Sequence, residues 1–308
     1  PLVSICCITY NHAPFIRQSL DGMLMQQGVD FEILIHDDCS TDGTTEIVKE
    51  YAAKYPNLIF PLYETENQFC KPGRESMDFY NFRRAQGKYI ATCEGDDYWT
   101  DSLKLQKQVN FMESHPEYSV CFHTFRNHIV QTDEYLESAP TQLLRNNGNP
   151  DGIDITMDMY FQKWYTQQLT MMFRVSMFSY EWSKQYKYYR DTHEMYHLIK
   201  EGKCRLMNFD GGVYNIHQGG ISSGIMHHAS CHGLHMCIID LYLHNKDDIV
   251  LCTYLKKVLL WVLSEYQKQK MISTCWKTLK EILRDTPELF PYIIGIHLKR
   301  NIKSILKH

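Results

Sequence analysis

Two short apolar segments of this chain each lead into an aspartate pair. Residues 31–36 (FEILIH) are followed directly by Asp37-Asp38, and residues 89–93 (YIATC) are followed by Glu94-Gly95-Asp96-Asp97. Apolar runs of this length that stop at polar, glycine-containing clusters are typical of buried strands ending in loops. In an open α/β sheet, ligands bind in the crevice beyond the carboxyl ends of the strands. We therefore expect both pairs to face one crevice, where a divalent cation on a diphosphate would offset the cost of adjacent carboxylates.

Strand and helix signals alternate through the first part of the chain. Strands are predicted over residues 2–8, 31–36, 58–63, 89–93 and 119–125, and helices over 15–26, 46–55, 76–85 and 100–114. Ser40 or Thr41 is the expected N-cap of the second helix. Repeated β-α-β units predict an α/β fold with a doubly wound, mostly parallel sheet flanked by helices.

The pattern changes in the rest of the chain. It is weak over residues 131–165, where 146–152 (NNGNPDG) is typical of a loop. Further elements are then predicted: strands at 169–174, 205–209 and 213–216, and helices around 177–188 and 194–200. From residue 228 onward the signal is helical. We predict a nucleotide-binding and catalytic domain over 1–225, with a nucleotide half (1–126) and an acceptor half (127–225), and a helical C-terminal extension over 226–308.

Composition narrows the class of protein. The net charge of −4 argues against a general nucleic-acid binder, which normally carries a basic surface. No run of about 18 apolar residues is present, so we expect no membrane-spanning helix. The eleven cysteines are scattered and odd in number, and several lie in apolar runs, where a free thiol packs as a small hydrophobe. Without a signal-peptide pattern, a reducing cytoplasm is the expected location.

Five stretches of the sequence, taken together and in this order, resemble the family-two glycosyltransferases of GT-A fold, the inverting enzymes that use nucleotide sugars. They are Val3–Asn11 (VSICCITYN), Ile33–Thr44 (ILIHDDCSTDGT), Gly87–Asp101 (GKYIATCEGDDYWTD), Tyr189–Gly202 (YRDTHEMYHLIKEG) and Val213–Ser223 (VYNIHQGGISS). The stretch 96–109 is especially similar to bacterial members that assemble polysaccharides. The resemblance covers about the first 225 residues and implies a GT-A-type sheet.

The resemblance implies a nucleotide site around the first aspartate pair. Asp38 corresponds to the aspartate that accepts a uracil N–H, and Thr9, Tyr10 and Asn11 would line the same pocket. Asp96 would face the ribose or a coordinated water. The alternative for residues 37–40 is a strand-to-helix turn in which the acidic side chains serve as caps.

The resemblance also implies a divalent cation, Mn²⁺ or Mg²⁺, as cofactor. Asp97 would be the direct ligand, because a hard cation prefers carboxylate oxygens. His217 matches a histidine that reaches the metal or diphosphate, although a lone histidine is as readily structural; imidazole suits manganese better than magnesium. Where the family often has arginine this chain has Asn215, which removes one diphosphate contact.

Asp191 stands where the family places its catalytic base. Inversion needs one carboxylate to take the proton of the acceptor hydroxyl as its oxygen attacks the anomeric carbon. The usual glycine before this aspartate is Arg190, whose charge would lower the pKa of Asp191. Glu194, three residues on, is the alternative base, and a helix N-cap is the structural alternative for Asp191.

The function that the resemblance implies is metal-dependent inverting transfer of a sugar from a nucleoside-diphosphate sugar, with UDP favoured, to a glycan or lipid-linked acceptor in cell-surface polysaccharide synthesis. Two other classes stay open. The departures at Arg190 and Asn215 fit a non-catalytic nucleotide-sugar-binding partner of another transferase. A nucleotidyltransferase also places metal-bound aspartates on a doubly wound sheet, but residues 7–12 (CITYNH) are not the glycine-rich phosphate loop it would need.

Two features of the C-terminal part are ambiguous. Residues 293–308 have apolar positions at helical spacing and four basic residues, which fits either a peripheral helix on an anionic membrane surface or a helix packed on the catalytic domain. The histidine- and cysteine-rich stretch 227–237 has the composition of a zinc site. Its spacing favours a packed helix, because structural zinc ligands come in tight pairs from two segments.

Overall fold

The structure is a computed structural model, and it describes residues 1–71, 76–163, 165–187, 189–220, 227–268, 272–289, 291–293 and 295. The chain divides into two compact units. The first contains Pro1–Tyr180 and Glu194–His217, and the second contains Glu181–His193 and Gln218–His308.

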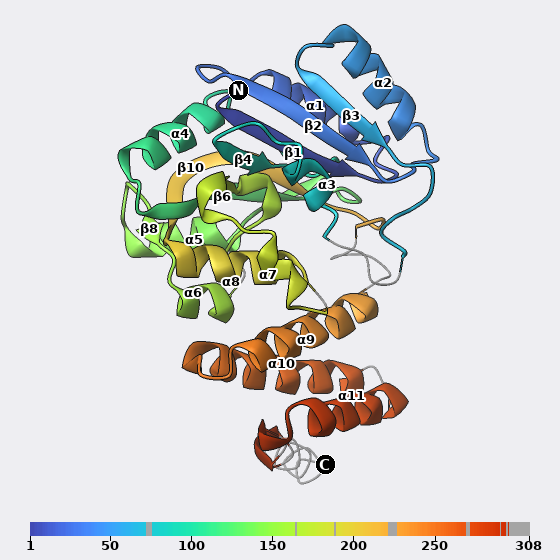
Figure 1. Cartoon of the computed structure of the whole chain (residues 1–308), viewed down its shortest axis with the longest axis vertical. Coiled ribbons are helices and arrows are strands. Elements are labelled where there is room, and N and C mark those ends of the chain that lie inside the picture. The colour runs from blue at the N-terminus through green and yellow to red at the C-terminus, as the bar shows by residue number, and fades with distance from the viewer. Residues whose placement is uncertain are drawn as a thin grey trace. The chain divides into compact units, whose positions relative to one another are not determined.

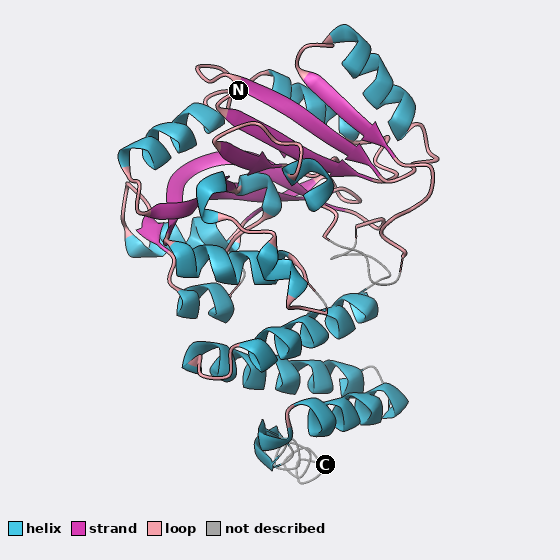
Figure 2. Cartoon of the chain, in the orientation of Figure 1, coloured by secondary structure: helices cyan, strands magenta, loops and turns pink. Residues whose placement is uncertain are grey.

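The first unit is built on a mixed sheet whose N-terminal half is parallel (Figures 1 and 2). Its four parallel strands, in spatial order, are β3 (Ile59–Tyr63), β2 (Phe31–Asp37), β1 (Val3–Thr9) and β4 (Tyr89–Thr92). The helices between them are α1 (Ile16–Leu24), α2 (Thr44–Lys54) and α3 (Phe79–Phe82). The chain moves outward from β1 to β3 and then returns to β4, so right-handed crossovers place α1 and α2 on one face and α3 on the other. This is the predicted doubly wound arrangement.

The other half of the sheet combines parallel and antiparallel strands. Beyond β4 the order continues with β9 (Met172–Arg174), β6 (Tyr118–Ile129), β10 (Lys203–Ile216) and β5 (Tyr98–Trp99). Strands β6 and β10 are parallel, whereas β9 and β5 run antiparallel to their neighbours. Two short strands pair at the margins, β7 (Glu134–Glu137) with β6 and β8 (Ile153–Asp154) with β10.

Several predicted elements need correction. The two short strands expected at 205–209 and 213–216 form the single strand β10, which keeps pairing with β6 through register shifts. The helix expected around 177–188 is too long: among the described residues of this segment, the α-helix is limited to α7 (Glu181–Lys184). The weakly patterned segment 131–165 contains real elements, α5 (Ala139–Asn147) and α6 (Met157–Gln162), besides β7 and β8. Helices α4 (Lys104–Ser114) and α8 (Asp191–Glu201) lie close to the predicted positions.

The second unit is helical, as predicted for this part of the sequence. Its main helices are α9 (His227–His244), α10 (Ile249–Lys268) and α11 (Ile272–Asp285). Among the helices that the structure describes, none combines the length and apolar character needed to cross a bilayer. The proposed membrane-contacting segment 293–308 lies almost wholly outside the described residues, as do the side chains of residues 227–235 in the candidate zinc stretch.

The core of the first unit packs β1 and β2 against α1. Ile5 and Cys7 of β1 and Ile33 and Ile35 of β2 are all buried, in a continuous cluster with apolar side chains of α1. The cysteines whose side chains the structure describes are free thiols. Burial raises the pKa of the Cys121 thiol to about 12, so this residue packs as a neutral hydrophobe.

Lys104, in the first turn of α4, is a charged residue type inside this core. Its side chain is 0% exposed, and its Nζ lies 3.8 Å from the ring centroid of Trp99. Burial lowers the pKa of Lys104 to about 7. Relative to an ordinary lysine, this shift corresponds to a cost on the order of 5 kcal/mol for keeping the charge in the folded state.

Replacing Lys104 by methionine should therefore stabilise the protein at neutral pH. The unfolded chain binds a proton at this lysine that the folded chain has released, so wild-type stability should rise as the pH increases from about 7 towards 10. Lys104→Met should lack that rise. The measurement is urea unfolding of both proteins at pH 7, 8.5 and 9.5. A stability difference that stays constant across this range would contradict the buried-amine interpretation.

Candidate active site

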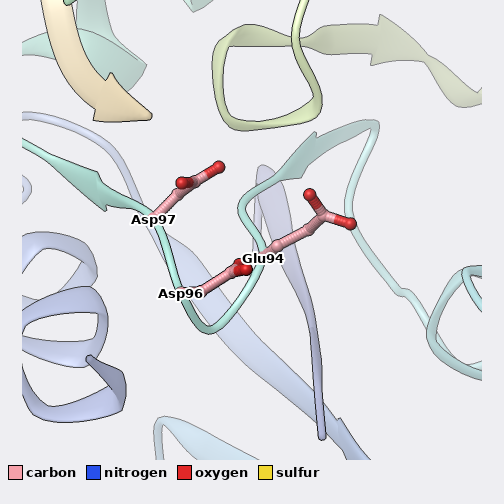
Figure 3. A group of neighbouring side chains, drawn as sticks. All are labelled: Glu94, Asp96 and Asp97. Carbon is pink, nitrogen blue, oxygen red and sulfur yellow. The ribbon is translucent and has the colours of Figure 1, made fainter. Parts of the chain in front are cut away.

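An acidic loop between β4 and β5 is the centre of the candidate site. It carries Glu94, Asp96 and Asp97, whose carboxylates lie within 4.8 Å of one another (Figure 3). The loop is held against the end of β1, because the Gly95 N–H donates to the Ile8 carbonyl at 2.9 Å. The first aspartate pair is held there too, since the Asp38 N–H donates to the Thr9 carbonyl at 3.0 Å. Both acidic segments therefore flank the carboxyl end of β1, as the sequence predicts.

Asp97 is the most deeply buried carboxylate of the loop. Its side chain is 1% exposed, and its Oδ1 accepts the backbone N–H of Asn215 at 2.9 Å. Its Oδ2 is buried and has no hydrogen-bond partner among the described residues. Burial, followed by the charges of Asp96 and Glu94, raises the pKa of Asp97 well above its ordinary value. A buried carboxylate with an open oxygen is costly, and a bound cation would remove most of that cost.

Asp96 lies between two imidazoles. Its Oδ2 is 3.1 Å from Nε2 of His217 and 3.6 Å from Nε2 of His12. Burial tends to raise the pKa of Asp96, but the hydrogen bond from His217 and the charge interaction with His12 outweigh it, and the pKa is lowered. The remaining oxygen, Oδ1, is buried and unpartnered within the part of the chain that the structure describes. Asp96 and Asp97 thus each offer one open oxygen.

His217, which the sequence singles out as a metal or diphosphate contact, does reach this loop. It follows the end of β10, and its ring packs against Phe15 with centroids 4.6 Å apart. Its Nε2 contacts Asp96 directly, so in this structure the histidine positions a carboxylate. Whether it also ligates a metal stays a prediction.

His12 is a site residue that the sequence analysis missed. Its backbone N–H donates to Oγ1 of Thr44 at 2.8 Å, which fixes the turn after β1. Glycine at position 95 allows the acidic loop to lie close to His12 and Thr9, because a Cβ there would be 3.0 Å from Nδ1 of His12 and 2.6 Å from Oγ1 of Thr9. The only signal in the sequence was an imidazole in the polar segment directly after the first strand.

The three residues predicted to line the nucleotide pocket have different surroundings. Thr9 is 3% exposed and its Oγ1 faces Gly95 of the acidic loop. Tyr10 is exposed, so its ring is available to a ligand. Asn11 has a left-handed backbone with φ of 55°, and its Oδ1 accepts the backbone N–H of Thr41 at 2.8 Å. Asn11 therefore connects the loops after β1 and β2.

The two aspartates of the first pair, Asp37 and Asp38, make different contacts. Asp37 accepts the Ser40 N–H at 3.1 Å and the Thr45 hydroxyl, which is the capping role considered as the alternative. Asp38 is buried, and its two oxygens accept the backbone N–H groups of Gln68 and Phe69 at 2.6 and 3.0 Å. Each carboxylate oxygen has a second lone pair, so these bonds leave capacity for a base N–H.

The predicted N-cap of α2 at Ser40 or Thr41 is wrong. The helix begins at Thr44, and its N-cap position is taken by Gly43, which makes no side-chain cap hydrogen bond. Oδ1 of Asp42, one residue before the N-cap, accepts the Thr44 N–H at 3.0 Å. The N-cap was missed because the side chains at positions 40, 41 and 42 are all favoured caps, whereas the structure places a glycine with a left-handed backbone at this position.

Asp191 and Glu194 open α8, and Asp191 is grouped with the second unit. Oδ1 of Asp191 accepts the N–H of Thr192 at 2.8 Å. Burial raises the pKa of Asp191, and the opposing charge of Arg190 is too weak to reverse it, contrary to the expected lowering. Glu194 is buried, with 1% of its side chain exposed. The assignment of either residue as the base stays a prediction.

Solved structures with the same fold carry nucleotide sugars. Residues 1–349 of S. aureus TarS, in complex with UDP-GlcNAc, match with a TM-score of 0.65 at 16% identity, over 94% of this chain and 83% of that one. The mannosyltransferase PcManGT of Pyrobaculum calidifontis, in complex with GDP-Man and Mn²⁺, matches with a TM-score of 0.56 at 17% identity, over 97% and 80% of the two chains. This likeness confirms the predicted GT-A-type fold.

Curated relatives match a shorter part of the chain. An uncharacterized protein of Mycobacterium tuberculosis is 45% identical over 126 residues, which is 40% of this chain and 35% of that protein. The Escherichia coli UDP-Glc:alpha-D-GlcNAc-diphosphoundecaprenol beta-1,3-glucosyltransferase WfaP is 32% identical over 132 residues, or 43% of this chain and 48% of that protein. The chain thus matches less than half the length of these two relatives.

The family model that matches is described as glycosyl transferase family 2, and it spans residues 4–198. This range includes β1 except for its first residue, the aspartate pairs at 37–38 and 96–97, and the start of α8. The match covers more than half of the chain, and it overlaps four of the five stretches that carried the resemblance in the sequence. The chain therefore belongs to glycosyl transferase family 2.

Proposed function

We propose that this protein is a metal-dependent, inverting glycosyltransferase that moves a sugar from a UDP-sugar to a glycan or lipid-linked acceptor in cell-surface polysaccharide synthesis. The observation that carries the proposal is the acidic loop at the end of β1. There Asp96 and Asp97 each present a buried carboxylate oxygen without a protein partner in the described chain. Family membership supplies the reaction class.

A divalent cation fits the residues of this loop. Asp97 would hold it through Oδ2, and Asp96 would contribute Oδ1 or hold the ribose, with Glu94 near enough to add a third carboxylate. When bound, the cation would neutralise charge on the departing diphosphate. The chain itself fixes the carboxylates: Asn215 holds Asp97, while His217 and His12 hold Asp96.

The donor is proposed to be a UDP-sugar held beside the acidic loop. Thr9, Tyr10 and Asn11 would line the nucleotide pocket, and Asp38 would accept a base N–H with its remaining lone pairs. TarS is described in complex with UDP-GlcNAc, and WfaP is named for a UDP-Glc donor and a diphosphoundecaprenol acceptor. Both descriptions support a UDP donor, and WfaP supports a lipid-linked acceptor.

The catalytic base is proposed to be Asp191, at the start of α8. It would take the proton of the acceptor hydroxyl, which requires the ionised carboxylate.

We propose that residues 1–225 carry the donor and acceptor sites and that 226–308 form an extension. A cytoplasmic location, with contact to the inner membrane face through the C-terminal segment, completes the proposal.

Incubation of the full chain with a panel of nucleotide sugars and Mn²⁺ tests the reaction class. We expect slow, metal-dependent release of UDP from one UDP-sugar, with water as the acceptor. Release of pyrophosphate would instead indicate a nucleotidyltransferase. Tight binding of a UDP-sugar without any turnover, even with a supplied acceptor, would favour a non-catalytic binding subunit.

A further inference from the structure

Asn215 and His128 are cross-strand neighbours at the edge of the candidate site. Strands β6 and β10 are parallel here, and their register places Asn215 opposite His128. The two side chains therefore lie on one face of the sheet, and Asn215 is on β10, the strand that also leads to His217. His128 has no role in the proposed chemistry, but its neighbour Asn215 contacts both aspartates of the acidic loop.

Asn215 holds the acidic loop with two donors. Its backbone N–H donates to Oδ1 of Asp97 at 2.9 Å, and its side-chain Nδ2 donates to the backbone carbonyl of Asp96 at 2.6 Å. Because Nδ2 must face a carbonyl, the orientation of the amide is fixed and its Oδ1 is an acceptor. That oxygen lies 2.7 Å from Nδ1 of His128, so the imidazole is the donor.

His128 is itself held on two sides. Its Nε2 lies 2.9 Å from Oδ1 of Asp133, and its ring stacks on Tyr135 with centroids 4.4 Å apart and planes 11° apart. Asp133 has a left-handed backbone with φ of 55°, an uncommon conformation for a residue other than glycine. Tyr135 is the partner of His128 in the β6–β7 pairing. The imidazole is thus fixed before any ligand arrives.

We propose that His128 is a positioning residue, which acts through Asn215 to orient the Asp96-Asp97 loop for the metal and the donor diphosphate. The identity of the ligand rests on the proposed function, but the contacts from His128 through Asn215 to the acidic loop are present in the metal-free protein. Loss of such outer partners of a metal site typically costs about 10–100-fold in metal affinity or activity. We expect an effect near the lower end of that range, because Asn215 keeps its backbone bond to Asp97.

The first test uses the full chain without ligand. Hydrogen exchange of the peptide covering residues 93–99 should be faster in His128→Ala than in wild type, because the Asn215 amide is no longer oriented. His115→Ala is the matched control: its ring also stacks on an aromatic side chain, Phe111, and its Nδ1 contacts a backbone carbonyl. The control should leave exchange in 93–99 unchanged. Equal exchange in wild type and His128→Ala would overturn the positioning role.

The second test is calorimetric titration with UDP and Mn²⁺. His128→Ala should bind UDP about 10-fold more weakly than wild type, and His128→Gln, which keeps a donor towards Asn215, should lie between them. In an Asn215→Ala background, His128→Ala should add almost nothing, since the two residues act in series. Additive losses would overturn the inference. Failure of the wild type itself to bind UDP would instead refute the proposed function, while the exchange result would still decide the role of His128.

Discussion

Asp97→Asn should abolish Mn²⁺-dependent binding of UDP and leave the metal-free protein at least as stable as wild type. The asparagine keeps the acceptor for the Asn215 N–H but removes the charge and the open oxygen that a cation needs. The pKa of Asp97 is raised well above its ordinary value, so ionising it in the folded, metal-free protein is unfavourable. Wild-type stability should therefore fall as the pH rises from the ordinary aspartate range through the raised pKa, and the variant should lack this fall.

Thermal unfolding with and without Mn²⁺ and UDP measures both parts of this prediction. Wild type should show a higher unfolding temperature with both ligands present, since binding to the native state stabilises it. Asp97→Asn should show no such increase. Asp30→Asn is the control, because it makes the same chemical change at an exposed side chain. A ligand-dependent increase of wild-type size in Asp97→Asn would show that the cation binds elsewhere.

The parts of this site that the sequence predicted are those that depend on local pattern. A buried strand followed by an acidic turn identifies residues 37–38 and 96–97, because a short apolar run and the polar turn that ends it are both visible within ten residues. The parallel connections between β1 and β4 then follow from the alternation of strands and helices, and they bring both acidic turns to the end of one strand.

The site features that the sequence did not predict depend on contacts between segments far apart in the chain. The role of Asn215 arises from the register of β10 against β6, including shifts in that register that no periodicity reveals. His12 matters only because Gly95 lets another loop approach it. The burial of Lys104 could not be foreseen either, since lysine in the first turn of a helix normally faces solvent. A residue whose role depends on tertiary packing has no local sequence pattern that reveals it. The sequence gives only the type of side chain, not its contacts.

Asp191→Asn should reduce turnover by about 10²–10⁴-fold while leaving UDP binding intact, as expected for loss of a general base. The asparagine keeps the acceptor for the Thr192 N–H, so the start of α8 should be preserved. The raised pKa of Asp191 adds a second expectation. The base is active only when ionised, so the acid limb of the wild-type pH profile should lie at a higher pH than the ordinary aspartate pKa of about 3.9 would place it.

Glu194→Gln is the decisive comparison, because Glu194 lies one helical turn further along α8 and is the alternative base. Turnover of the identified UDP-sugar, with UDP affinity measured in parallel, separates three cases. Loss of turnover in Asp191→Asn alone supports the assignment. Near-normal turnover in Asp191→Asn with loss in Glu194→Gln moves the base to Glu194. Weaker UDP binding in either variant would mean that the residue supports the donor site, since a base that acts on the acceptor hydroxyl has no reason to change donor affinity.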